Sequence, residues 1–274
     1  MPDEAIGSVA ALWRYPVKSM MGEELNAARV TPRGLAGDRA YALVDPATGR
    51  IGSAKVTRKW GRLFACRARY ESEPDGSGQA PPARIVFPDG DIASTADRGI
   101  DARLSRELGF AVTLASTPPA KLVLESPALG TVPESDDAPT MEFPVLNGFF
   151  DLGSLHILTT GTLDHLRALY PEGRFEVRRF RPNIVVQTPP GERGFLENGW
   201  SGRTLAIGDE VRVRVMGPTI RCVMTTLAQD DLPADPGILR TAAQHNQANV
   251  GVYAMVERPG RVLRGDAVRI APSP

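Results

Sequence analysis

The stretch EVRVRVM, residues 210–216, alternates valines with arginines. Successive side chains of a β-strand point to opposite faces, so its three valines would share one face and its two arginines the other. The sequence GDE, residues 208–210, is typical of a tight turn that leads into a strand. The stretch therefore predicts a strand with one buried face.

Short segments of similar character occur along most of the chain. They are rich in β-branched and aromatic residues, and most are bounded by Gly, Pro or Asp, as is typical of strands. These segments are residues 8–17, 39–45, 62–70, 183–187, 251–257 and 267–271. We expect a mainly β protein of α+β type, with barrel-like sheets and strand content well above helix content.

Three segments predict short helices. Residues 97–108 place apolar side chains at fourfold spacing and are followed by Gly109. Residues 160–170 carry three leucines on one face, with Thr160 or Thr162 as the expected cap and Pro171 after them. Residues 235–246 begin with Asp then Pro, the expected order of helix cap and first helical residue.

Composition limits the class of protein. The chain has 274 residues, 42% of them hydrophobic, and its 32 basic residues balance its 32 acidic residues. A dedicated nucleic-acid binder normally carries a basic excess, so this balance argues against that class. The two cysteines lie far apart, the acidic start does not resemble a signal peptide, and no apolar run approaches membrane-spanning length. We therefore expect a cytoplasmic protein without a membrane span.

A proline-rich stretch at residues 117–148 separates the chain into two β-rich halves. We accordingly predict an N-terminal β-barrel-like domain over residues 1–118 and a C-terminal β-barrel domain over residues 119–274. Several catalytic motifs are absent from the sequence, including a GxxxxGK[ST] phosphate loop, GxGxxG, GxSxG and HExxH. The three histidines form no zinc-binding pattern and are expected to be polar structural residues.

Cations stand at four predicted strand ends: Lys18, Arg39, Arg181 and Arg221. Turns expose backbone N–H groups that bind anions, and Lys and Arg add charge to them, so a converged set would hold a phosphate-bearing ligand. Alternatively, each cation caps its strand and faces water. Cys222 directly follows Arg221 in PTIRCVMTT, residues 218–226, and is either a packing residue or a ligand or nucleophile beside a positive charge.

These motifs, in their order, resemble the MOSC family. They are YPVKS (15–19), RGLAGDRAYALVD (33–45), RRFRPNIVV (178–186), the Gly-Asp turn before a strand, and RCVMTT (221–226). That family comprises the C-terminal domain of molybdenum-cofactor sulfurase and its relatives, preceded by a MOSC N-terminal β-barrel domain. The similarity runs from about residue 6 to about residue 271.

The resemblance implies a site for molybdenum-molybdopterin. Cys222 matches the cysteine that ligates the metal, and Lys18 and Ser19 match the pair that contacts the pterin phosphate. The other implied cofactor-binding residues are Arg39, Arg181, Asn183, Arg221 and Tyr253, with Asp151, Leu152 and Gly153 as further candidates. A thiolate is a soft ligand that suits molybdenum. Pyridoxal phosphate binding is also associated with the family.

The implied activity is reduction of N-oxygenated compounds, such as N-hydroxylated bases or amidoximes. Electrons would come from a separate carrier protein and its reductase, because the chain lacks the cysteine set of an iron–sulfur domain. Two alternatives remain: a carrier that binds the cofactor or sulfur without turnover, and a barrel that binds another anion. We expect the cofactor motifs of both halves to face one cleft, and Cys66 to be a buried small hydrophobe in the strand 62–70.

Overall fold

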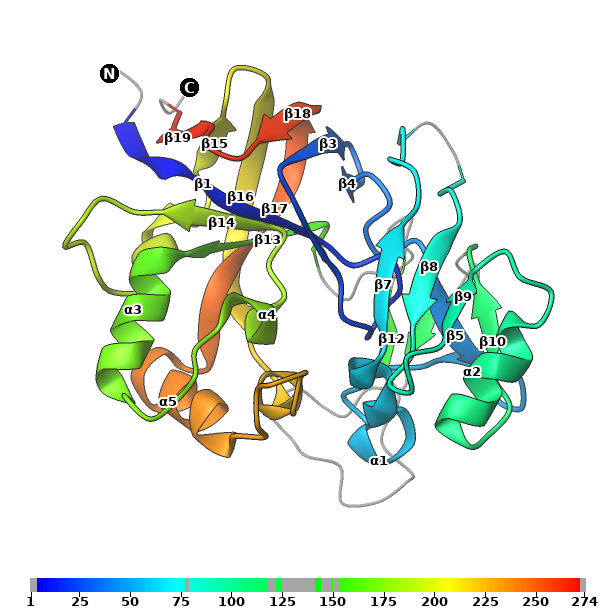
Figure 1. The fold of residues 1–274 in the computed structure, drawn as a ribbon. Coiled ribbons are helices and arrows are strands. Elements are labelled where there is room, and N and C mark those ends of the chain that lie inside the picture. The colour runs from blue at the N-terminus through cyan, green and yellow to red at the C-terminus, as the bar shows by residue number, and fades with distance from the viewer. Residues whose placement is uncertain are drawn as a thin grey trace. The chain divides into compact units, whose positions relative to one another are not determined.

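The computed structural model describes residues 4–76, 79–117, 122–124, 141–143, 149 and 153–271. The chain divides into two compact units, each assembled from separate stretches. We call residues 1–13, 24–36 and 152–274 the barrel unit, and residues 14–23 and 37–151 the second unit. Both are visible in Figure 1. The boundary predicted between residues 118 and 119 lies outside the described residues and stays a prediction.

The barrel unit is built on one eight-stranded sheet. Its order is β14 (Ile184–Gln187), β13 (Leu155–Thr159), β17 (Asn249–Arg258), β16 (Val211–Ile220), β15 (Thr204–Ile207), β19 (Ala267–Ile270), β1 (Glu4–Arg14) and β2 (Glu23–Leu25). An additional antiparallel pairing of β1 with β14 brings Leu12 opposite Ile184 and closes the first seven strands into a barrel. A smaller sheet of β18 (Gly260–Leu263), β3 (Ala27–Thr31) and β4 (Gly34–Leu35) belongs to the same unit.

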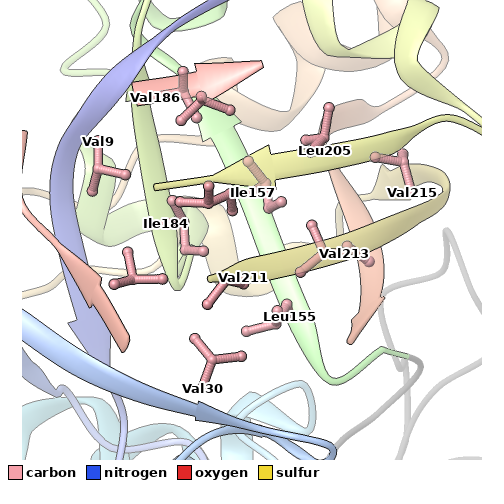
Figure 2. Packing of buried hydrophobic residues seen from close by; sticks show 14 of the residues in the cluster. Val9, Val30, Leu155, Ile157, Ile184, Val186, Leu205, Val211, Val213 and Val215 are labelled. Atoms are coloured by element: carbon pink, nitrogen blue, oxygen red, sulfur yellow. The ribbon is translucent and has the colours of Figure 1, made fainter. Parts of the chain in front are cut away.

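The interior of the barrel is filled by aliphatic side chains from its strands (Figure 2). Val211, Val213 and Val215 are buried there, whereas Arg214 between them is exposed. The predicted alternation is confirmed. Leu155 and Ile157 of β13 join the same cluster. Burial of these side chains, at about 25 cal/mol per Å² of apolar surface, supplies the main force that holds the barrel closed.

Two predicted helices pack together at one end of the barrel strands (Figure 1). Helix α3 (Thr160–Leu169) is capped by Thr159, whose hydroxyl accepts from the amide of Thr162 at 3.1 Å, and not by the predicted Thr160 or Thr162, which lie inside the helix. Helix α5 (Pro236–Asn246) is capped by Asp235, as the Asp-Pro order predicts. The short elements α4 (Val177–Phe180), η2 (Leu196–Trp200) and η3 (Val223–Thr226) complete this unit.

The second unit combines two small sheets with short helices. One sheet has the order β10 (Thr113–Ala115), β5 (Ala42–Asp45), β6 (Arg50–Ile51), β11 (Leu122–Leu124) and β12 (Met141–Phe143). The other has the order β7 (Arg67–Tyr70), β8 (Ala83–Val86) and β9 (Ile92–Ser94). The helical elements are α1 (Thr57–Trp60), η1 (Gly61–Ala65) and α2 (Ile100–Leu108), the last within the predicted helical segment.

The strand predicted at residues 62–70 requires a correction. Only Arg67–Tyr70 form a strand, because residues 61–65 form the 3₁₀ helix η1. Trp60, Leu63 and Phe64 are all buried, and their spacing of three and four residues places them on one side of a helical turn. Arg39 likewise precedes its strand, which begins at Ala42.

Strands dominate both units, and the mainly β prediction is confirmed. Among the described residues, every helix is too short or too polar to span a membrane.

Candidate functional site

Cys222 lies in a turn at the end of a long strand of the barrel unit. Strand β16 ends at Ile220, and Cys222 has an extended backbone directly before η3. The carbonyl of Cys222 accepts from the amide of Thr225 at 3.1 Å and from its hydroxyl at 3.0 Å. The thiol is free and half-buried. The turn therefore fixes the backbone of Cys222, a residue that is only half-buried.

Arg221 extends from this turn into the barrel unit. Its backbone amide donates to the carbonyl of Ala248 at 2.7 Å, and its Nη2 donates to the carbonyl of Phe180 at 2.8 Å. Its guanidinium lies 5.9 Å from the centre of the Phe180 ring. The Nε atom is buried and has no hydrogen-bond partner in the described part of the chain. A buried donor without an acceptor is costly, so this atom is a candidate contact for an anionic ligand.

Arg181 follows helix α4 with a left-handed backbone at φ 52°. Its side chain is 8% exposed. The nearby Asn183 is buried, and its side chain accepts from the amide of His156 at 3.1 Å and donates to the carbonyl of Trp13 at 3.3 Å. The side chain of Asn183 thus joins β1, β13 and the start of β14.

Tyr253 lies in the middle of β17, between β13 and β16. A Cβ atom on Gly153 would lie 2.7 Å from a carbon of the Tyr253 ring, so only glycine permits this approach. The rings of Tyr253 and His156 are 6.2 Å apart. His156 itself is buried and its Nε2 lies 3.1 Å from the carbonyl of Val250, as fits the structural role expected of the histidines. Asp151 and Leu152 lie outside the described residues.

In the second unit, two of the predicted motifs run side by side. The amide of Arg39 donates to the carbonyl of Tyr15 at 2.8 Å, and that of Tyr41 to the carbonyl of Pro16 at 3.0 Å. The amide of Lys18 in turn donates to the carbonyl of Tyr41 at 2.8 Å. These bonds form a short parallel pairing between residues 15–18 and 39–41, which brings Lys18 and Arg39 into one local structure.

The side chains of this set are largely buried. Lys18 is 6% exposed and its Nζ donates to the carbonyl of Phe149 at 3.0 Å. The hydroxyl of Ser19 accepts from the amide of Ala54 at 3.1 Å. Lys18 and Ser19 are therefore held inside the unit and do not project into water as simple strand caps would.

Arg39 has an anionic neighbour that sequence reasoning missed. Its guanidinium pairs with the buried carboxylate of Asp38 and lies 4.7 Å from the centre of the Tyr15 ring. The same carboxylate accepts from the amide of Tyr15 at 2.8 Å. The signal was the acidic residue of the Gly-Asp-Arg sequence, which was interpreted only as part of a turn.

Unusual backbone geometry marks several of the predicted site residues. Among the described residues other than glycine, those with positive φ are Ser19, Arg39, Arg181, Asp230, Gln247 and Ala248. Three of these belong to the predicted cofactor-binding set, and a fourth, Ala248, accepts the hydrogen bond of Arg221. Such conformations cost on the order of 1–3 kcal/mol each and gather at functional sites. The strained backbone thus marks Ser19, Arg39 and Arg181 as candidate site positions, independently of the chemistry of their side chains.

Two further residues, Arg179 and Cys66, are fully buried but have different surroundings. Sequence reasoning missed Arg179, which is fully buried and contacts the segment after Cys222. Its signal was the arginine doublet that opens RRFRPN, whereas only Arg181, after the doublet, was selected as a site residue. Cys66 is buried in the second unit, and burial raises the pKa of its thiol to about 12. That environment fits the packing role expected of Cys66. A cleft shared by Cys222, Lys18 and Arg39 stays a prediction.

Comparison with known proteins shows what the chain is similar to. It is 24% identical to mitochondrial amidoxime-reducing component 1 of Homo sapiens, over 97% of this chain and 83% of that protein. It is 28% identical to mitochondrial amidoxime reducing component 2 of Macaca fascicularis, over 97% of this chain and 84% of that protein. Neither these relatives nor the described residues support pyridoxal phosphate binding.

The solved structures that match this chain have lower sequence identity to it than these relatives do. The YUAD protein of Bacillus subtilis aligns over 100% of this chain and 98% of its own, with 13% identity and a TM-score of 0.48. YiiM of Escherichia coli aligns over 47% of this chain and 58% of its own, with 16% identity and a TM-score of 0.34.

Two family models match successive parts of the chain. The MOSC N-terminal beta barrel domain matches residues 6–76, and the MOSC domain matches residues 149–269. The motifs from YPVKS to RCVMTT all lie within these two ranges. The chain belongs to the MOSC family and carries both a MOSC N-terminal beta barrel domain and a MOSC domain.

Proposed function

We propose that this protein is a molybdenum-cofactor-dependent oxidoreductase that reduces N-oxygenated compounds with electrons from a separate donor protein. Membership of the MOSC family and the similarity to amidoxime-reducing components support a function related to the molybdenum cofactor. The observation that carries the finer proposal is the contrast between the half-buried thiol of Cys222 and its rigidly bonded backbone. A metal ligand needs both accessibility of its sulfur and a fixed position.

The residues around Cys222 fit such a cofactor. The thiolate of Cys222 would ligate the molybdenum, which favours soft sulfur ligands. Arg221 offers a buried Nε donor without an acceptor among the described residues, and the buried Arg181 adds a second positive charge to this unit. When bound, the cofactor supplies two-electron redox chemistry at the metal.

The protein itself would bind and orient the cofactor and shield it from water. Thr225 holds the carbonyl of Cys222 through two hydrogen bonds, so the backbone that carries the thiol keeps one position relative to the end of β16. Gly153 allows the Tyr253 ring to approach the backbone closely, which makes this ring a candidate wall of the substrate site. Lys18, Ser19 and Arg39 are proposed to contact the pterin phosphate, since charge-assisted bonds to phosphate are among the strongest that a protein forms.

Metal and pterin analysis is the first test. The protein would be made in a host that assembles the cofactor, and molybdenum and pterin would be measured per protein chain. We expect both to be present in about equal amounts, as required for one cofactor per site. Purified protein that contains neither would contradict the proposal and favour a barrel that binds another anion.

Turnover is the second test. Benzamidoxime reduction with an artificial one-electron donor would be compared with reduction by a nicotinamide coenzyme alone. We expect turnover only with the artificial donor or with an added reductase and electron carrier. Protein that holds molybdenum and pterin yet reduces no N-oxygenated compound would instead be assigned as a cofactor or sulfur carrier. Turnover with the coenzyme alone would contradict the need for a separate donor.

A further inference from the structure

Arg179 is a fully buried cation next to the candidate metal ligand in the barrel unit. It lies in the short helix α4, and its side chain is 0% exposed. No carboxylate of the described residues lies within ion-pair distance of it, so backbone carbonyls are its partners. Burial lowers the pKa of this guanidinium from its ordinary value. A buried charge is normally retained only where its hydrogen bonds do structural or functional work.

The bonds of Arg179 converge on one segment of the chain. Nη1 donates to the carbonyl of Thr225 at 3.2 Å and to that of Leu227 at 3.1 Å. Nη2 donates to the carbonyl of Pro233 at 2.8 Å, and Nε donates to the carbonyl of Arg174 at 2.9 Å. Three of these four acceptors belong to residues 225–233, which follow Cys222. A planar guanidinium with five N–H donors can satisfy several carbonyls at once, whereas an ammonium cannot span the same positions.

The segment has other supports, among them two bonds from Arg174 to the carbonyl and carboxylate of Asp231. Its own backbone bonds link Gln229 with Leu232 in both directions and join the amide of Asp235 to the carbonyl of Thr226 at 2.8 Å. Asp230 has a left-handed backbone at φ 48°. Arg179 differs from these supports because its buried guanidinium binds three carbonyls spread over residues 225–233, which makes it an internal anchor of the segment.

This anchor connects directly to Cys222. Arg179 holds the carbonyl of Thr225, and the amide and hydroxyl of the same Thr225 hold the carbonyl of Cys222. We propose that Arg179 is a positioning residue, which fixes the turn of residues 222–227 so that the Cys222 thiol can act as the metal ligand. The metal role of Cys222 rests on the proposed function, whereas the ordering of the turn by Arg179 does not.

Arg178 provides a matched control. It is the adjacent arginine of the same helix, and it reaches the same segment through ion pairs to Asp230 and Asp231. These pairs are partly exposed to solvent, where an ion pair contributes little. Arg178→Gln thus removes an arginine and a contact to residues 230–231 without removing the buried anchor.

The first experiment is hydrogen exchange on cofactor-free protein, compared among wild type, Arg179→Gln, Arg179→Lys and Arg178→Gln. We expect Arg179→Gln to speed amide exchange across residues 222–235 by at least about tenfold, the effect of losing charge-assisted bonds, while the barrel strands change little. Arg179→Lys should lie between this variant and wild type. Arg178→Gln should resemble wild type. Unchanged amide exchange in Arg179→Gln, or an equal rise of the exchange rate in every segment, would contradict the role of Arg179 as an anchor of residues 222–235.

The second experiment measures molybdenum per pterin in protein from a cofactor-producing host. Arg179→Gln should lower this ratio with pterin retained, because removing a group that orients a metal ligand usually costs about 10–100-fold in metal affinity. A ratio equal to that of wild type, despite faster exchange in the segment, would overturn the positioning role. A wild type without molybdenum would contradict the proposed function, and exchange would still decide whether Arg179 orders the turn. Should Arg179→Gln fail to fold, Arg179→Lys decides both measurements.

Discussion

Cys66 and Cys222 have opposite surroundings, although neither forms a disulfide. Cys66 lies in an apolar cluster of the second unit with residues such as Trp60 and Leu63, and it is 0% exposed. Cys222 follows a strand of the barrel unit, is half-buried and has an arginine directly before it. In the first case the apolar neighbours bury the sulfur, and in the second the hydrogen bonds of the turn hold the backbone.

The difference shows which kind of order each role needs. Packing requires only that the side chain fill a space, so a thiol there can be inert and neutral. Ligation requires a thiol whose direction is set by its backbone and whose sulfur remains accessible. Thr225 and Arg179 supply this constraint at Cys222, whereas at Cys66 the backbone carbonyl accepts from the amide of Met21 at 2.9 Å and the side chain is fully buried. The two sites therefore predict opposite responses to the same substitution.

Replacing the thiol at Cys222 should have the largest effect. Cys222→Ser changes a soft ligand into a hard and mostly protonated hydroxyl. Loss of a group that only hydrogen-bonds to a metal ligand typically costs roughly 10–100-fold in activity. Because Cys222 is itself the proposed ligand, we expect turnover of an N-oxygenated substrate per protein chain to fall by more than that. The fold should survive with a loss of about 1 kcal/mol, since the change in volume is small.

This prediction is checked by turnover and by molybdenum content, measured on the same preparation as thermal unfolding. Pterin retention provides an internal control, because the contacts proposed for Arg181 and the second unit do not depend on the sulfur. Normal turnover per molybdenum in Cys222→Ser would show that Cys222 is a packing residue after all.

Removing a nearby cation should have the next largest effect. Arg181→Ala deletes a charge-assisted contact and should weaken cofactor retention by about 1.5–3 kcal/mol. Arg181→Lys should keep part of that retention because it keeps the charge. Retention would be measured as pterin per chain after extensive dialysis.

Backbone strain at Arg181 allows a second check. Its φ of 52° is a conformation that glycine adopts more easily than alanine. Arg181→Gly should therefore be the more stable of the two truncations and yet retain no more pterin than Arg181→Ala. Better retention by the glycine variant would mean that backbone geometry, and not the charge, holds the cofactor.

The sequence predicted the barrel well because its pattern is local. The valine and arginine alternation of residues 210–216 is set by the two faces of one strand, and the helix at residues 236–246 by an Asp-Pro start. The strand expected at residues 62–66 was wrong because burial of Leu63 and Phe64 is equally compatible with a 3₁₀ turn. Short apolar runs do not determine their own period.

Only those residues of the candidate site that lie in a recognisable sequence motif were predicted. Arg221 and Cys222 are adjacent in sequence, so their proximity needed no fold. The link from Arg179 to Thr225 joins residues 46 positions apart, and the strain at Ala248 comes from the turn between α5 and β17. Neither follows from local pattern, because both arise from how distant segments pack.

The same substitution at the other cysteine should act on stability alone. Cys66→Ser places a hydroxyl in an apolar cluster, and a buried polar group without a partner costs about 1–3 kcal/mol. Turnover per bound molybdenum should equal that of wild type. Urea unfolding measures the first quantity, and activity normalised to metal content measures the second. A loss of turnover per molybdenum in this variant would contradict the assignment of packing to Cys66.

The smallest expected effect is a dependence of stability on alkaline pH that comes from Cys66. Burial raises the pKa of this thiol from 9.0 to about 12, so between these values the unfolded chain loses a proton that the folded protein keeps. The stabilisation that the neutral thiol contributes is complete below pH 9 and is lost as the pH rises toward 12. The slope from one such group is at most about 1.4 kcal/mol per pH unit.

Cys66→Ala removes this group and should unfold with a shallower loss of stability between pH 9 and pH 10.5 than wild type. Burial also raises the pKa of Tyr70, but that group is present in both proteins and cancels in the comparison. Urea unfolding of both proteins across this range measures the difference. Parallel curves would show that Cys66 is less isolated from water than its position in the cluster implies, and the contrast with Cys222 would then rest on the backbone alone.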